Sequence, residues 1–126
     1  MKFAKRVFLI AGIWGLLVLV PMYFLEEKNG RDFPPPINHP EYYYGFVGVG
    51  VAWQVLFLIL SKDPQRYRPM MIPAVLEKLT FSLAIFWFYL QHKVPVTLLG
   101  AGIIDFTLGV LFAVSYLKTP NPERTQ

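Results

Sequence analysis

Apolar residues gather in four blocks along the chain, and polar residues and prolines separate the blocks. The blocks are Val7–Leu25, Tyr42–Leu60, Met70–Leu90 and Val96–Leu117. Each has the roughly 20 mostly apolar residues that a helix needs to cross a bilayer core of about 30 Å. None has the polar face that a helix of a soluble bundle would show. The pattern therefore predicts an all-α, integral membrane four-helix bundle that forms a single transmembrane domain over residues 1–126.

Prolines mark the ends of the predicted helices. Proline is well suited to a first helical position because the backbone N–H of that position has no intrahelical partner. Pro40 and Pro95 are therefore predicted to open the second and fourth helices. Basic residues precede the first block, as they precede the apolar core of a signal peptide, but no small-residue cleavage motif comes after the block. We expect it to remain attached as a signal anchor.

Lysine and arginine are divided unevenly between the two predicted sides of the membrane. Three precede the first block, three lie between the second and third, and two follow the fourth, whereas the remaining loops hold two and one. Short cytoplasmic loops carry an excess of these residues. The expected protein is therefore a multi-pass membrane protein with both termini in the cytoplasm and the lipid bilayer as its surroundings.

Composition narrows the chemistry that the chain can perform. Hydrophobic residues make up 55% and charged residues 16%, against about 25% charged in soluble domains. The chain has no Cys, which excludes disulfides and thiol catalysis, and its 2 His do not favour a zinc site. No phosphate loop or dinucleotide fingerprint is present, so no cofactor is expected. Nucleic acid is not an expected partner, because no basic face lies on a soluble domain.

Four polar side chains lie within the apolar blocks and are the candidate functional residues: Gln54, Glu77, Lys78 and Asp105. A charge at the centre of a membrane helix costs about 2.5–3.5 kcal/mol, so such residues are rare and predict function. Asp105 shares a helical stripe with Gly102 and Gly109, and small residues allow helices to approach closely. We therefore expect Asp105 to face protein, and we hypothesise that the four form a polar interior cluster that binds a ligand.

A purely structural role is the alternative for these residues. Adjacent residues on a helix do not face one another, so Glu77 and Lys78 are not expected to pair. Lys78 could instead extend its side chain toward the cytoplasmic end of its helix. Asp105 is predicted to lean toward the outer side, away from Lys78, and could be a hydrogen-bonded group that fixes helix packing.

Two further features lie outside this cluster. His39, Glu41 and His92 could meet at the outer face and bind a divalent metal. The favoured interpretation is two exposed histidines and a first-turn glutamate that stabilises a helix N-terminus, so no metal site is predicted. Gly45, Gly48 and Ala52 share one helical face, which indicates tight packing within the monomer or between copies.

The stretch from HPEYYYGFVGVGVAWQ through DPQRYRPMMIPAVLEK to the Asp105 helix resembles an uncharacterised family of small four-span bacterial membrane proteins. The helix layout is also similar to that of DoxX-like four-helix proteins. This resemblance implies the architecture and a place in the bacterial inner membrane, but no activity.

Three function classes remain open. The first, which we favour, binds or transports a small molecule or proton through the interior polar residues, either as a single chain or as a homo-oligomer. The second is an accessory or structural subunit of a larger membrane complex. The third is a membrane enzyme that uses Glu77 or Asp105 as acid or base. We favour a protein without enzymatic activity over this third class.

Overall fold

The computed structural model describes residues 2–121, and this part of the chain is helical without any strand. Its long helices are α1 (Lys2–Leu19), α3 (Pro40–Lys62), α4 (Met71–Leu90) and α5 (Val96–Lys118). A 3₁₀ turn, Val20–Phe24, extends α1, and another, Arg68–Met70, leads into α4. The predicted all-α architecture with four long apolar helices is confirmed. The first helix begins before the predicted block because its basic residues, which an apolar pattern does not count, are also helical.

Three residues that directly precede a proline lie at the boundaries of helices. Phe33, His39 and Asp63 each precede a proline, and their ψ angles are 71°, 72° and 76°. Steric contact with the proline ring disfavours the α region for the preceding residue. Pro40 is the first residue of α3, and Pro95 is the extended residue directly before α5. The predicted start at Pro40 is thus confirmed, whereas Pro95 lies one residue before the first helical residue, Val96, and not at the first helical position.

A short helix, α2 (Glu26–Asp32), lies in the segment that the sequence pattern treats as a loop. Glu26 lies in its first turn, where a negative charge suits the helix dipole, and its carboxylate accepts a hydrogen bond of 2.9 Å from the Tyr44 hydroxyl of α3. Asn29 of α2 donates to the Tyr43 hydroxyl at 2.9 Å. The two tyrosines therefore fasten α2 to the start of α3.

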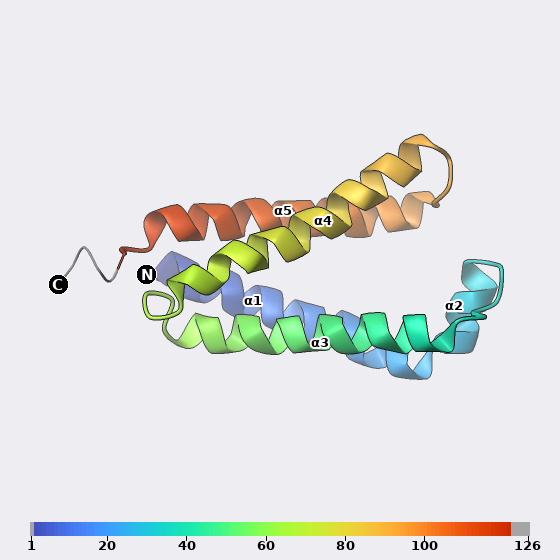
Figure 1. The fold of residues 1–126 in the computed structure, drawn as a ribbon, viewed down its shortest axis with the longest axis horizontal. Helices are drawn as coiled ribbons and strands as arrows, with labels where there is room; N and C mark the ends of the chain where they lie inside the picture. Colours follow the sequence, from blue (N-terminus) through green and yellow to red (C-terminus); the bar gives the residue numbers. More distant parts are fainter. Residues whose placement is uncertain (1, 122–126) are drawn as a thin grey trace.

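The long helices form two pairs. α1 packs against α3 and α4 packs against α5, while α1 and α5 provide the main contact between the pairs (Figure 1). Where the pairs meet, the Phe8 ring stacks on Phe112 with 4.2 Å between ring centroids, and Phe57 meets Phe112 edge-on at 4.9 Å. The buried core around these rings is Ala4, Val7, Phe8, Ala11, Phe57, Leu60, Met71, Ala74 and Phe112.

The core lies in the half of the bundle that carries both termini. In the opposite half of α5, residues 96–107, Gly102 is the one buried residue, and the structure describes that whole stretch. Figure 1 shows the turn between α4 and α5 well away from the far ends of α1 and α3. The two helix pairs are therefore joined at the terminal end and diverge toward the other.

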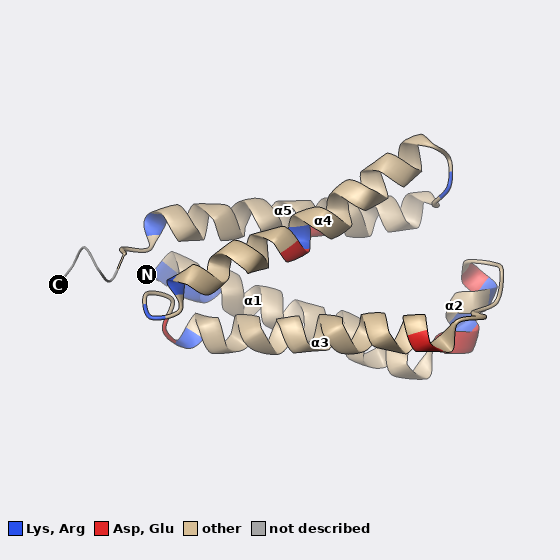
Figure 2. Cartoon of the chain, in the orientation of Figure 1, with Lys and Arg blue, Asp and Glu red and all other residues tan. Residues whose placement is uncertain are grey.

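The surface of the four long helices is largely apolar. In each helix, an 18-residue apolar window has at most 28% of its residues buried, and all four are long and apolar enough to cross a membrane. A soluble monomer rarely exposes so much contiguous apolar surface, so these helices indicate a membrane protein. Lys and Arg gather at the end with both termini, and acidic residues gather at the opposite end (Figure 2).

Candidate functional site

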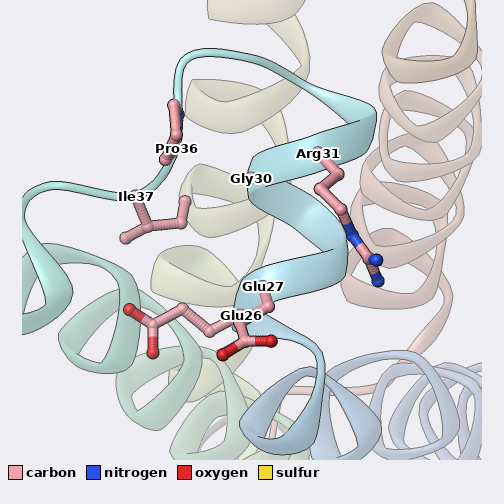
Figure 3. Close-up of a pocket in the computed structure, with 6 residues that line it drawn as sticks. All are labelled: Glu26, Glu27, Gly30, Arg31, Pro36 and Ile37. Carbon is pink, nitrogen blue, oxygen red and sulfur yellow. The ribbon is translucent and has the colours of Figure 1, made fainter.

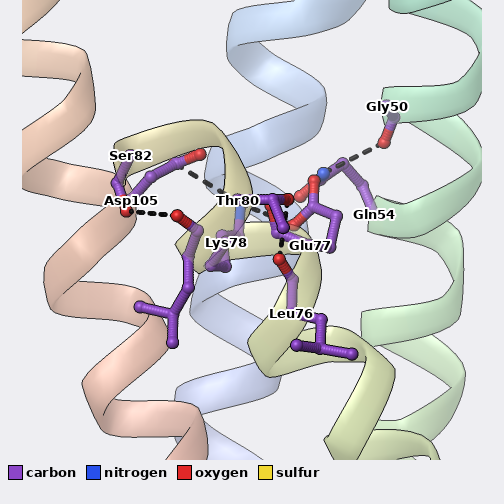
Figure 4. Close-up of polar contacts among 9 residues, drawn as sticks. Gly50, Gln54, Leu76, Glu77, Lys78, Thr80, Ser82 and Asp105 are labelled. Carbon is purple, nitrogen blue, oxygen red and sulfur yellow. Dashed lines mark hydrogen bonds and ion pairs between the residues drawn. The ribbon is translucent and has the colours of Figure 1, made fainter. Parts of the chain in front are cut away.

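The interior of the bundle contains a buried lysine between two carboxylates. Lys78 of α4 is 4% exposed. Its Nζ lies 3.5 Å from Oδ1 of Asp105 on α5 and 3.7 Å from Oε2 of Glu77 (Figure 4). The side chains of both carboxylates are 21% exposed. We refer to Glu77, Lys78 and Asp105 as the charged triad.

Glycines on α5 bring the two helices of this pair close enough for the triad to form. A Cβ at Gly109 would lie 3.3 Å from the Lys78 Cβ, and a Cβ at Gly102 would lie 2.9 Å from the Ile85 Cγ2. Both contacts are closer than ordinary Cβ packing. Asp105 lies between these glycines on the same stripe and therefore faces α4.

The triad also touches the other helix pair. The Lys78 ammonium lies 5.3 Å from the centroid of the Phe57 ring on α3. An ammonium over an aromatic face is attracted by the negative face of the ring, and this attraction is stronger where water is excluded. Since Phe57 is also a member of the aromatic core, the triad lies next to the region where the two helix pairs meet.

Gln54 faces the bundle interior from α3, one turn before Phe57, and is 1% exposed. Its Nε2 donates a hydrogen bond of 3.0 Å to the Gly50 carbonyl of its own helix. Its Oε1 lies against α1, where Gly15 leaves room for it, because a Cβ at Gly15 would overlap that oxygen. Close approach of α1 and α3 therefore depends on glycine here.

Two buried oxygens of this region have no hydrogen-bond partner among the described residues. They are Gln54 Oε1 and Glu77 Oε2. Figure 4 shows these two side chains pointing toward one another from α3 and α4. Buried acceptors are normally paired with a donor from protein, water or a ligand, so the region has unused capacity to accept hydrogen bonds.

Two sequence expectations about the triad are wrong. Glu77 and Lys78 do approach one another, and Lys78 does not extend to the end of its helix but bonds to Asp105. The expected lean of Asp105 away from Lys78 does not keep the groups apart. The reason is the length of the lysine side chain: four flexible methylenes let the ammonium reach sideways to α5 and back to its neighbour.

The outer histidines do not assemble into a metal site. His39 Nδ1 lies 3.0 Å from Oε1 of Glu41, and both side chains are mostly exposed. His92 lies in the turn between α4 and α5, which Figure 1 places away from the start of α3. Within residues 2–121, no group of three or more His, Cys, Asp or Glu could hold a metal ion. His39, Glu41 and His92 are all exposed.

Sequence reasoning missed two parts of the molecule. The first is Phe57, which contacts Lys78 and which nothing in the sequence distinguishes from the other apolar residues of α3. The second is a surface pocket of about 420 Å³ beside α2 (Figure 3). It is lined by Glu26, Glu27, Gly30, Arg31, Pro36 and Ile37. The acidic first turn of α2 was a signal for a helix start there.

Comparison of the chain with family models, with curated proteins and with solved structures finds no match. The resemblance to small four-span bacterial membrane proteins and to the DoxX-like layout therefore stays a prediction.

Proposed function

We propose that the chain is a multi-pass protein of the bacterial inner membrane, with both termini in the cytoplasm, that binds a proton or a small polar ligand at its interior site and moves it across the membrane. Two observations support this placement. Four helices have the length and composition of membrane spans. Lys and Arg are concentrated at the end that carries both termini, as they are on the cytoplasmic side of membrane proteins (Figure 2).

The observation that carries the proposal is the buried ammonium of Lys78 between two carboxylates. With all three groups ionised, the triad has one excess negative charge. An uncompensated charge is costly within an apolar bundle, and such residues in membrane proteins mark ion and proton pathways. One proton or one small cationic group would make the triad neutral, so its composition suits a ligand of that charge.

Partial exposure of the carboxylates supports uptake of such a ligand. Glu77 and Asp105 each keep 21% of the side chain exposed, although Lys78 is almost fully buried. They lie about halfway along the bundle. Between the two ends of the bundle, the triad residues are the only charged residues of α4 and α5 (Figure 2). Beyond them the helix pairs diverge. A ligand could therefore reach the carboxylates without first disrupting the aromatic core.

The test is proton movement into liposomes that contain the purified protein and a trapped pH-sensitive dye, driven by a potassium diffusion potential. We expect flux above that of protein-free liposomes. Glu77→Gln and Asp105→Asn should each lower it by at least about tenfold, because each removes a charge-assisted contact of the triad. Glu27→Gln, which removes a carboxylate beside α2, is the matched control and should keep the wild-type flux.

Equal flux in the wild type and both triad variants would exclude proton transport through this site. The same comparison of variants, with small organic amines in place of protons, tests whether the site transports a small polar ligand. Each variant is first checked for a single size-exclusion peak and a wild-type helical spectrum, so that loss of flux is not mistaken for loss of folding.

A second candidate function, that of a subunit in a homo-oligomer or a larger membrane complex, has its own observation. Gly45 and Ala52 lie on one face of α3 and are exposed, and a Cβ at Gly45 would meet nothing within 4 Å. Small residues on an outer face let a second helix approach closely. If the face is an interface, Gly45→Leu should reduce the mass of the particle extracted in mild detergent, whereas Gly100→Leu, at an equally open position of α5, should not.

A further inference from the structure

The two carboxylates of the triad do not bind Lys78 in the same way. The Lys78 ammonium donates a hydrogen bond to Asp105 Oδ1 at 3.5 Å. Glu77 Oε2 lies farther away, at 3.7 Å, and is a buried atom without any hydrogen-bond partner among the described residues. The contact of Lys78 with Asp105 is therefore the shorter of its two ion pairs, and Glu77 Oε2 is the carboxylate oxygen left without a hydrogen bond.

Gln54 presents a second acceptor in the same state. Because its Nε2 donates to the Gly50 carbonyl, the orientation of the amide is fixed and Oε1 is the atom that remains. That oxygen is buried and unpaired, and the side chain is aimed toward Glu77 across the space between α3 and α4 (Figure 4). Two facing acceptors need one donor between them.

The charges around Glu77 come from two elements. Lys78 lies next to it on α4, and Asp105 faces it from α5. The nearby residues of α3 and α1, Gln54 and Gly15, are uncharged. With Lys78 and Asp105 balancing one another, Glu77 is the group whose ionised form would leave a net charge in the interior.

We propose that Glu77 is the residue that takes up the proton, and that its Oε2–H donates a hydrogen bond to Gln54 Oε1. Asp105 stays ionised as the counter-ion of Lys78. One proton then supplies the missing donor for both unpaired oxygens and removes the excess charge of the triad. The Gly15 position on α1 keeps Gln54 in place for this bond.

This inference deepens the proposed function, on which it rests for its physiological meaning, by naming the group that binds the proton. Its own test does not need transport. At neutral pH the surface carboxylates of the protein are ionised, so the infrared C=O band of a protonated carboxylic acid reports a buried one.

The experiment records this band in lipid-reconstituted wild-type protein, in H₂O and in D₂O, with carboxyl ¹³C label in either glutamate or aspartate. We expect a band that shifts in D₂O and moves with the glutamate label alone. No substitution is needed, so the result does not depend on whether a variant folds. A band that moves with the aspartate label, or no protonated-acid band at all, would overturn the proposal.

Variants then identify the residue and its acceptor. Glu77→Gln should remove the band, whereas Glu27→Gln, at an exposed position of α2, should keep it. Gln54→Leu should keep the band but move it to higher frequency, because the O–H loses its acceptor. An unchanged frequency in Gln54→Leu would exclude the bond to Gln54. If the band behaves as expected but liposomes show no flux, the proton site stands and the transport function fails.

Discussion

The charge balance in the interior of the bundle depends on Lys78. This residue is 4% exposed, and its ammonium contacts the carboxyl groups of Asp105 and Glu77 and the ring of Phe57. Breaking a buried ion pair by removing one partner costs about 3–5 kcal/mol, because the remaining charge stays buried without compensation. Replacing both partners removes the charge on each side and costs less.

We therefore expect Lys78→Met to be strongly destabilising, by about 3–5 kcal/mol, and Asp105→Asn in the same chain to recover part of the loss. The measurement is a double-mutant cycle from thermal unfolding in detergent, and the expected coupling free energy is about 0.5–3 kcal/mol. Lys62→Met, at the exposed end of α3, serves as the control and should change stability little. Additive effects of the two interior substitutions would show that Lys78 and Asp105 do not interact.

At the scale of elements, the pairing of α4 with α5 depends on glycines whose side-chain space the neighbouring helix fills. A Cβ at Gly102 would lie 2.9 Å from Ile85 Cγ2 and 3.3 Å from Phe86 Cε1. Gly100, two residues earlier on the same helix, has open space where a Cβ would be. The two positions lie on the same helix but differ in packing. A comparison of substitutions at them therefore separates the effect of tertiary packing from that of helix propensity.

We expect Gly102→Ala to lower the free energy of unfolding by about 1–3 kcal/mol, because the added methyl pushes α5 away from α4. Gly100→Ala should be neutral or stabilising by up to about 1 kcal/mol, since alanine favours helix and meets no neighbour. Thermal unfolding followed by circular dichroism compares the two. Equal midpoints would mean that the α4–α5 contact is looser than the structure indicates.

At the scale of the whole molecule, charge separates the two ends. Most Lys and Arg lie at the end with the termini, whereas four acidic residues, Glu26, Glu27, Asp32 and Glu41, gather in α2 and the first turn of α3 at the other end (Figure 2). Basic segments next to a membrane favour the cytoplasmic side, where anionic lipids add to the attraction. Orientation in the membrane is therefore a property of the complete charge distribution and of no single residue.

Because the chain has no Cys, single cysteines can report this orientation without a background signal. We expect Lys28→Cys in α2 to react in intact cells with a maleimide that cannot cross the membrane. Arg66→Cys, in the segment between α3 and α4, should react after the cells are permeabilised. The reverse labelling pattern would place both termini outside and contradict the proposed topology.

The class of fold and the starts of α3 and α5 follow from local features of the sequence, which did not predict α2 or the first residues of α1. Apolar blocks of membrane-spanning length are a local property, and the prolines next to Phe33, His39 and Asp63 act on the backbone of the preceding residue. Neither depends on how the helices pack. The same holds for the selection of Gln54, Glu77, Lys78 and Asp105, because a polar residue in an apolar block is conspicuous without any coordinates.

The tertiary structure decided how those four residues are combined. Helical spacing predicted that Glu77 and Lys78 would not meet and that Asp105 would lean away, but a long flexible lysine and the close glycine contacts of α5 brought all three together. Gln54 and Glu77 face one another because separate helix pairs place them there (Figure 4). Distances between side chains on different helices depend on packing across the whole bundle, and spacing along one helix does not encode them.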